Sequence, residues 1–65
     1  MDVKRIANKL LELRDGRPRS EVAQACGISV SAVAMYEQGM RVPKDDIKIK
    51  LAKYYGVPVE SIFYV

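Results

Sequence analysis

The chain of 65 residues has no histidine, no tryptophan and only one cysteine, Cys26. A metal centre built from histidine and cysteine ligands is therefore excluded, and so is a disulfide within the chain. Histidine is the side chain best suited to general acid or base chemistry near neutral pH, and a glycine-rich phosphate loop is also missing. These absences argue against an enzyme, and no cofactor is expected.

Long hydrophobic runs are absent as well. A membrane-spanning helix needs roughly 20 consecutive apolar residues, and no segment approaches that length. Near the N-terminus, Lys4, Arg5, Asn8 and Lys9 interrupt the apolar residues, which excludes the unbroken core of a signal peptide. Acidic residues in the same segment weaken the alternative of a membrane-surface helix. We expect a cytoplasmic protein with no membrane partner and no small-molecule ligand.

Apolar residues make up 49% of the chain, which is typical of a globular domain and too high for a disordered tail. A chain of this length buries only about 60% of its unfolded surface. A single domain over residues 1–65, built from short and closely packed elements, is therefore expected. Eleven Lys and Arg against eight Asp and Glu give a net charge of +3, which is compatible with a nucleic-acid partner.

The hydrophobic periodicity predicts an all-α fold of five short helices. Asp2 is a plausible N-cap of the first helix, and Pro18 is tolerated only in the first turn of the second. The region between Pro43 and Gly56 also shows alternating apolar residues over five positions. With no second strand to pair with it, we interpret that region as a helix. The expected ranges are 2–14, 18–26, 29–38, a fourth helix between 43 and 56, and a short turn from about 58.

The stretch "GISVSAVAMYEQG", residues 27–39, carries no charge before Glu37, although the chain as a whole is basic. Two short helices joined by a tight turn with glycine form a helix-turn-helix unit, and this stretch supplies the turn and the second helix. Val33 and Tyr36, three positions apart, are expected to face the core. The side chains left facing outward are small or uncharged: Val30, Ser31, Ala34, Met35 and Gln38. A helix with that surface is suited to a narrow space.

Four motifs follow one another along the chain: "EVA" in the second helix, "GIS" in the turn, "YEQGMRVP" after the third helix, and "LAKYYGV" in the fourth. With these motifs the chain resembles the xenobiotic-response-element (XRE) or Cro/lambda-repressor type of helix-turn-helix domain, from about Ile6 to Phe63. The resemblance implies a compact five-helix DNA-binding domain of a transcriptional regulator, most often a repressor. It also implies that the third helix enters the major groove of double-stranded DNA.

Carried over by position, the resemblance assigns base contacts to Val30, Ser31, Ala34 and Met35. Ser31 can exchange a hydrogen bond with a base edge, and the apolar side chains fit thymine methyl groups. Relatives that read bases with glutamine or arginine differ here from this chain. Part of its specificity is therefore expected to come from DNA shape.

The resemblance also assigns phosphate contacts near the ends of the second and third helices, to Arg17, Arg19, Ser29, Gln38, Arg41 and Lys44. Free N–H groups at the start of the second helix favour a phosphate near Arg17 and Arg19. The lysines of the fourth helix, Lys48, Lys50 and Lys53, are interpreted instead as a solvated charged face.

Glu37 stands in the last turn of the third helix, where a negative charge opposes the helix dipole by roughly 0.3–1 kcal/mol. A cationic partner would offset that cost. The family pattern implies an arginine from the end of the first helix, which is Arg14 here. We therefore expect an ion pair between Arg14 and Glu37.

The chain ends in four apolar residues, Ile62, Phe63, Tyr64 and Val65. Ile62 and Phe63 can close the core, and the four together are the candidate dimer interface. A homodimer would place two reading helices about 34 Å apart on a palindromic operator. An alternative stays open: an antitoxin or anti-repressor whose main partner is another protein, because the same fold serves both functions.

Overall fold

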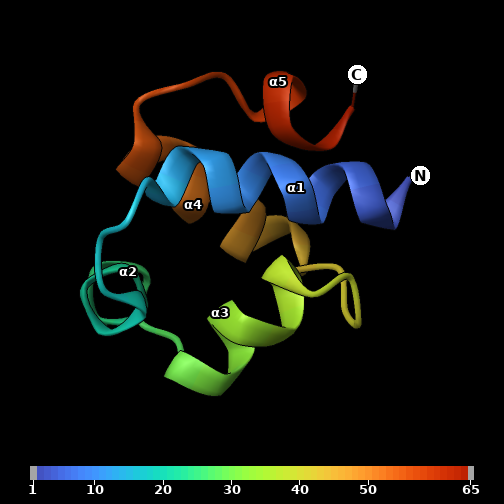
Figure 1. Ribbon diagram of the computed structural model, residues 1–65. Helices are drawn as coiled ribbons and strands as arrows, with labels where there is room; N and C mark the ends of the chain where they lie inside the picture. The colour runs from blue at the N-terminus through green and yellow to red at the C-terminus, as the bar shows by residue number, and fades with distance from the viewer. Residues whose placement is uncertain (1, 65) are drawn as a thin grey trace.

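The computed structural model describes residues 2–64, which form five α-helices and no strand (Figure 1). The helices are α1 (Val3–Arg14), α2 (Arg19–Cys26), α3 (Val30–Glu37), α4 (Asp45–Tyr55) and α5 (Val59–Phe63). The predicted all-α fold of five short helices is confirmed, and each helix lies within two residues of its expected range. Among residues 2–64, none of the helices has the length and apolar character that a bilayer crossing requires.

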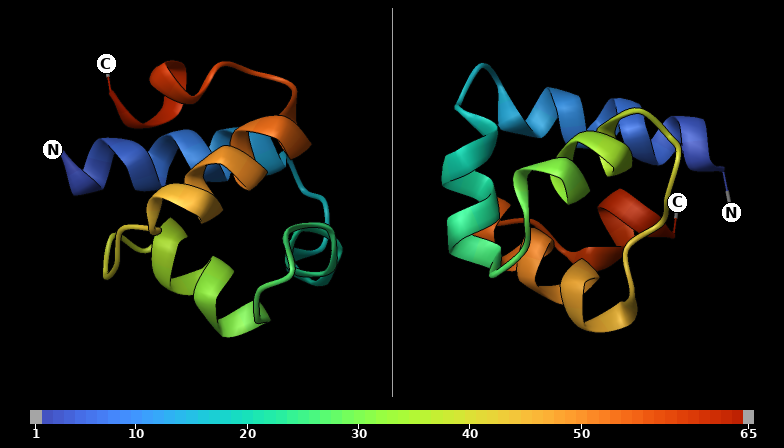
Figure 2. Two further views of the ribbon diagram at one scale, coloured as in Figure 1. Left: turned by 180° about the vertical axis from the view of Figure 1, so that it is seen from behind. Right: turned by 90° about the horizontal axis from the view of Figure 1, so that it is seen from below.

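The helices pack as a small cluster with α3 at its edge. Contacts join α2 to α3 and α4, α1 to α3 and α5, and α4 to α5. The C-terminal end of α3 approaches α1, whereas its N-terminal end projects outward (Figure 1). The two ends of the chain lie on the same side of the molecule in all three views (Figure 2). The beginning of α3 is thus left uncovered by the rest of the fold.

Local capping explains where the helices around this edge begin and end. The Asp2 carboxylate accepts the N–H of Arg5 at 3.1 Å and opens α1, as predicted. The Ser29 hydroxyl oxygen accepts the N–H of Ala32 at 3.0 Å and opens α3. Gly27 ends α2 at φ +66°, a left-handed conformation that costs glycine no steric penalty. The turn between α2 and α3 is therefore set by its own residues.

The core draws on all five helices. Its buried side chains are Ile6, Leu10, Val22, Ala23, Cys26, Val33, Tyr36, Leu51, Ala52, Ile62 and Phe63. Val33 and Tyr36 face inward as predicted, and they fix which side of α3 is left outside. Burial raises the pKa of the Cys26 thiol, so this cysteine behaves as an apolar core residue.

One lysine of α4 is not part of a solvated face. Lys48 is only 6% exposed, and its ammonium donates to the hydroxyl oxygen of Tyr64 at 3.0 Å. The same ammonium lies 4.9 Å from the centre of the Tyr64 ring and 5.6 Å from that of Phe63. The interpretation of Lys48 as solvated is therefore wrong, because the end of the chain folds over it. Lys50 and Lys53 are exposed as expected.

The end of the chain is divided between the core and the surface. Ile62 and Phe63 are 2% and 3% exposed, so they close the core and offer no surface to a second copy. Tyr64 is 54% exposed. Val65 lies outside the described residues. Of the four residues predicted to form a dimer interface, Tyr64 is therefore the one that the structure places on the surface of residues 2–64.

Candidate nucleic-acid interface

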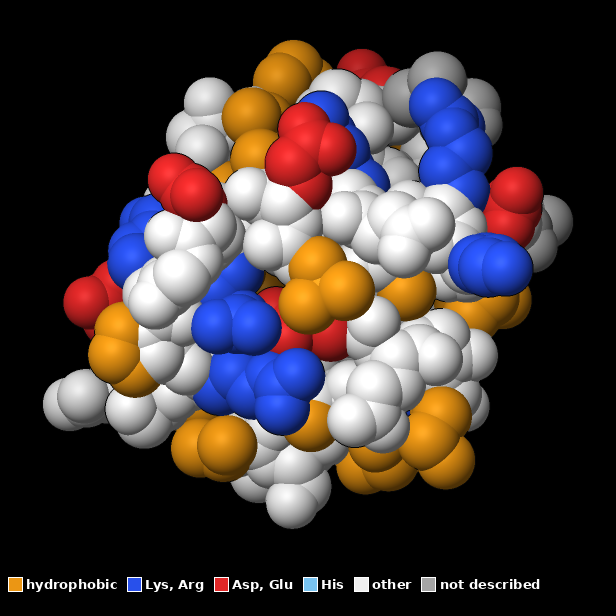
Figure 3. Space-filling model, in the orientation of Figure 1, with side chains coloured by type: hydrophobic (Ala, Val, Ile, Leu, Met, Phe, Trp, Pro, Cys, Tyr) orange, Lys and Arg blue, Asp and Glu red, His pale blue; other side chains and the backbone are white. Residues whose placement is uncertain are grey.

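The outer face of α3 is an uncharged surface. It consists of the predicted outward residues: Val30, Ser31, Ala34, Met35 and Gln38. Val30 is 48% exposed, Ser31 and Gln38 are exposed, and Ala34 and Met35 are half-buried. Uncharged side chains occupy the lower edge of the molecule in Figure 3, where Figure 1 places α3. Val30 is therefore on the surface and not packed beneath its own chain.

Ser29 and Gln38 stand at the two ends of this face. Ser29 is the N-cap of α3, and Gln38 is its C-cap residue, with φ −96°. Both are exposed. The Ser29 hydroxyl oxygen is occupied by the N–H of Ala32, but its own proton remains available for donation. Two neutral hydrogen-bonding side chains thus border the outer face of α3.

Two exposed cations follow in the segment between α3 and α4. Arg41 and Lys44 make no side-chain hydrogen bond or ion pair with any other residue of the described chain. Lys44 precedes the first turn of α4 as its N-cap residue and does not cap it with its side chain. Both side chains are therefore free to bind an anion next to the outer face of α3.

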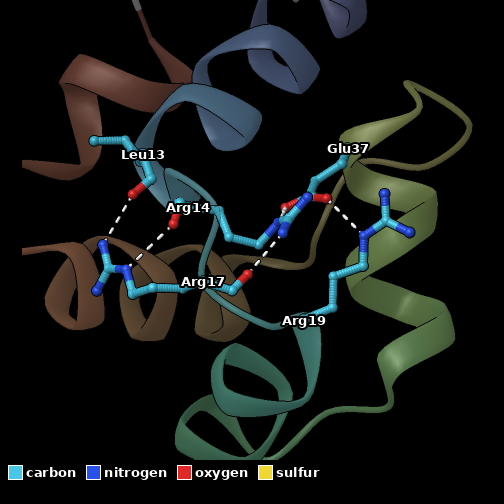
Figure 4. A network of polar contacts seen from close by, with 5 residues as sticks. All are labelled: Leu13, Arg14, Arg17, Arg19 and Glu37. Carbon is cyan, nitrogen blue, oxygen red and sulfur yellow. Dashed lines mark hydrogen bonds and ion pairs between the residues drawn. The ribbon is translucent and has the colours of Figure 1, made fainter.

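Arg17 is engaged elsewhere. Its Nη2 donates to the carbonyl of Leu13 at 2.9 Å and its Nε to the carbonyl of Arg14 at 3.2 Å (Figure 4). The guanidinium also lies over the rings of Tyr54 and Tyr55, at 5.3 Å and 5.5 Å from their centres. Arg17 therefore caps the end of α1 and joins it to α4. The structure does not bring this side chain together with the other predicted phosphate contacts.

Glu37 is buried at the end of α3 and is held by two arginines. Its Oε2 accepts the Nε of Arg14 at 2.7 Å, which is the pair that the sequence predicted. Its Oε1 accepts the Nε of Arg19 at 2.9 Å, which the sequence analysis missed (Figure 4). In the space-filling view, a small acidic surface lies beside basic side chains near the middle of the molecule (Figure 3). Glu37 thus joins α1, α2 and α3.

Two tyrosines of α4, Tyr54 and Tyr55, interact with acidic residues of α2 and α3. The Tyr54 hydroxyl donates to the Glu21 carboxylate of α2, and this hydrogen bond raises the pKa of Tyr54. Burial, reinforced by the negative charge of Glu37, raises the pKa of Tyr55 to about 12. Neither contact was predicted.

Comparison with known proteins places the fold among characterised sequences. The sequence model of a family described as helix-turn-helix matches residues 4–62. A curated relative, the cryptic phage CTXphi transcriptional repressor RstR of Vibrio cholerae, is 36% identical over 58 residues. That alignment covers 86% of this chain and 52% of the relative, so the chain spans about half the length of the repressor. No solved structure matches the chain.

Proposed function

The chain belongs to the helix-turn-helix family, and on that premise we propose that it is a sequence-specific DNA-binding regulator of transcription. In this proposal α3 enters the major groove of a palindromic operator and the chain acts as a repressor. The observation that carries the proposal is the exposed, uncharged outer face of α3 with free cations beside it. The regulatory sense is supported by the relative, whose name describes a transcriptional repressor.

Base reading falls to Val30, Ser31, Ala34 and Met35. The major groove is about 12 Å wide and admits a helix, provided that side chains at its leading edge are short. Ser31 exchanges a hydrogen bond with a base edge, and the apolar residues contact thymine methyl groups. Because none of these contacts is bidentate, sequence-dependent DNA shape supplies part of the specificity.

Phosphate binding falls to the polar and cationic residues around α3: Arg19, Ser29, Gln38, Arg41 and Lys44. Arg41 and Lys44 supply free charge, while Ser29 and Gln38 supply neutral donors that fix the register. Arg17 keeps its contacts with α1 and α4 and stabilises the fold, so we assign it no phosphate. Each cation that neutralises a phosphate should contribute about 0.9 to the slope of log K against log salt concentration.

A homodimer completes the proposal. Two copies related by a two-fold axis would present two α3 helices about 34 Å apart, one turn of DNA, and would require a palindromic site. Tyr64, exposed at the end of α5, is the residue we assign to the dimer contact. Since its target is DNA, we place the chain in the cytoplasm.

Selection of bound duplexes from a random DNA pool tests this function. We expect a palindromic consensus with thymines opposite Val30 and Met35, and binding that tightens as salt is lowered. A matched selection with an Arg41→Gln, Lys44→Gln variant should recover the same consensus with weaker binding. Failure to enrich any sequence, together with salt-independent or absent duplex binding, would overturn the proposal. Capture of a specific protein partner instead would favour an antitoxin or anti-repressor.

A further inference from the structure

The two arginines that hold Glu37 are not equivalent. Arg14 uses Nε on the carboxylate and Nη1 on the backbone carbonyl of Arg17, both at 2.7 Å. Arg19 uses Nε on the carboxylate at 2.9 Å and makes no other polar contact within residues 2–64. The Arg14 side chain is 18% exposed and that of Arg19 is 35% exposed. The polar contacts of Arg14 therefore hold the fold together, whereas Arg19 keeps nitrogens that make no polar contact within residues 2–64.

The charges of this cluster do not cancel. One carboxylate faces two guanidinium groups, so one positive charge is left in excess. The side chain of Glu37 is 2% exposed, which keeps its negative charge away from an approaching anion. Since Arg14 is the more deeply buried partner, the excess positive charge is exposed to solvent at the guanidinium of Arg19.

The geometry of Arg19 also leaves one edge of its guanidinium unused. Figure 4 shows both terminal nitrogens of Arg19 directed away from the Glu37 carboxylate, on the side of α3. Two parallel N–H donors on such an edge match two oxygens of one phosphate. A lysine could not serve both partners in this way, because its ammonium is a single compact point charge.

We propose that Glu37 is a positioning residue for DNA binding: it holds Nε of Arg19 so that Nη1 and Nη2 receive a backbone phosphate at a fixed place relative to α3. This inference rests on the proposed function. Glu37 lies in the last turn of α3 and Arg19 begins α2. The phosphate contact is thereby tied to the helix that reads the bases. A side chain ordered in advance spares the cost of ordering it on binding, worth about three- to tenfold in Kd.

The first test asks whether Glu37→Gln weakens or tightens DNA binding. Binding of the 65-residue chain to a mixed-sequence DNA duplex is measured over a range of salt concentrations, with circular dichroism establishing that each variant is folded. Glu37→Gln removes a negative charge, so a purely electrostatic role predicts tighter binding. Positioning predicts binding about three- to tenfold weaker at the same salt concentration. Glu12→Gln is the matched control, because Glu12 is an exposed acid of α1, and it should bind as tightly as the parent or slightly more tightly.

The second test does not need Glu37→Gln to fold. Arg19→Lys keeps the charge but loses the guanidinium edge, so its Kd should rise by about three- to tenfold with little change in the salt slope. Arg41→Lys, at an exposed arginine with no carboxylate partner among residues 2–64, should lose less.

The outcomes separate this inference from the proposed function. If Arg19→Lys binds as tightly as the parent, or Glu37→Gln binds more tightly, while both still show salt-dependent binding, positioning is overturned and DNA binding stands. If the parent chain itself shows no salt-dependent binding to any duplex, the proposed function fails and the inference fails with it.

Discussion

The Nε of Arg14 and the Oε2 of Glu37 lie 2.7 Å apart and join the last turn of α1 to the last turn of α3 across 23 positions of sequence. The carboxylate is buried and its partner is nearly so. Such a pair contributes less through its attraction than through the penalty for breaking it, since the remaining charge is left without a partner away from water. In a domain of this size that penalty is a large part of the total stability.

Breaking this pair should therefore destabilise the fold strongly. Glu37→Ala leaves both Arg14 and Arg19 without their carboxylate and should lower the free energy of unfolding by about 3–5 kcal/mol. Arg14→Ala should lower it by less, because Arg19 still pairs with the buried Glu37. The loss in the double variant should fall short of the sum by about 0.5–3 kcal/mol. Urea denaturation followed by circular dichroism measures all four proteins.

The exposed pair between Lys9 and Glu12, at 3.8 Å, provides the control. Its side chains are 37% and 74% exposed, so removing either should cost less than about 1 kcal/mol. Strict additivity of the Arg14 and Glu37 variants would show that the two side chains do not stabilise one another.

Replacing Lys48 by methionine should cost little. Lys48 is 6% exposed, so its apolar stem is buried, and methionine keeps most of that buried apolar surface. The carboxylate of Asp45, 3.6 Å from the ammonium, has a side chain that is 91% exposed and can return to water. We expect Lys48→Met to change the free energy of unfolding by less than about 1.5 kcal/mol. Lys48→Ala removes the stem and should cost more, about 2 kcal/mol or above. Equal losses in the two variants, measured by thermal unfolding, would show that the charge of Lys48, not its packing, stabilises the fold.

Stability should decline in alkaline solution. The folded state raises the pKa of Tyr55 to about 12, chiefly by burial, and a hydrogen bond to Tyr64 raises that of Lys48. In the unfolded chain these groups lose their protons near pH 10. Between about pH 10 and 12 the unfolded state therefore binds fewer protons than the folded state, and the free energy of unfolding falls as pH rises.

Urea denaturation at increasing pH measures this decline. Tyr55→Phe removes one of the groups responsible and should make the decline shallower, even if it changes stability at neutral pH. An identical pH dependence in Tyr55→Phe and the parent would contradict the raised pKa of Tyr55.

Local patterns predicted the parts of this structure that depend on local contacts. Asp2 caps α1 through the N–H of a residue three positions away, the glycine of the turn, Gly27, ends α2 through its own backbone conformation, and the spacing of Val33 and Tyr36 fixes the inner side of α3. Each of these follows from the chemistry of a few consecutive residues. The outer face of α3 could therefore be predicted before the fold was known.

Long polar side chains could not be placed in this way. Arg19 pairs with a residue 18 positions away, and Lys48 with one 16 positions away. Helical periodicity shows from which side of a helix a lysine or arginine side chain projects, but it does not show which distant segment covers that side chain. Lys48 lies next to the Ile47 and Leu51 stripe of α4, and only the path of α5 decides that it is covered.

Base reading and phosphate binding should respond differently to mutation. Ser31→Ala removes a hydrogen-bonding group from the outer face of α3, so relative affinities among duplex sequences should change by about 1 kcal/mol while the salt slope stays the same. Arg41→Gln removes a free cation, so affinity should fall for every duplex and the salt slope should decrease by about 0.9. Fluorescence anisotropy with the selected operator, a single-base variant and a mixed-sequence duplex separates the two effects. A salt slope that changes in Ser31→Ala would contradict the assignment of Ser31 to base reading. A sequence preference that changes in Arg41→Gln would contradict the assignment of Arg41 to phosphate binding. Both residues are exposed, so neither variant should unfold the chain and obscure the comparison.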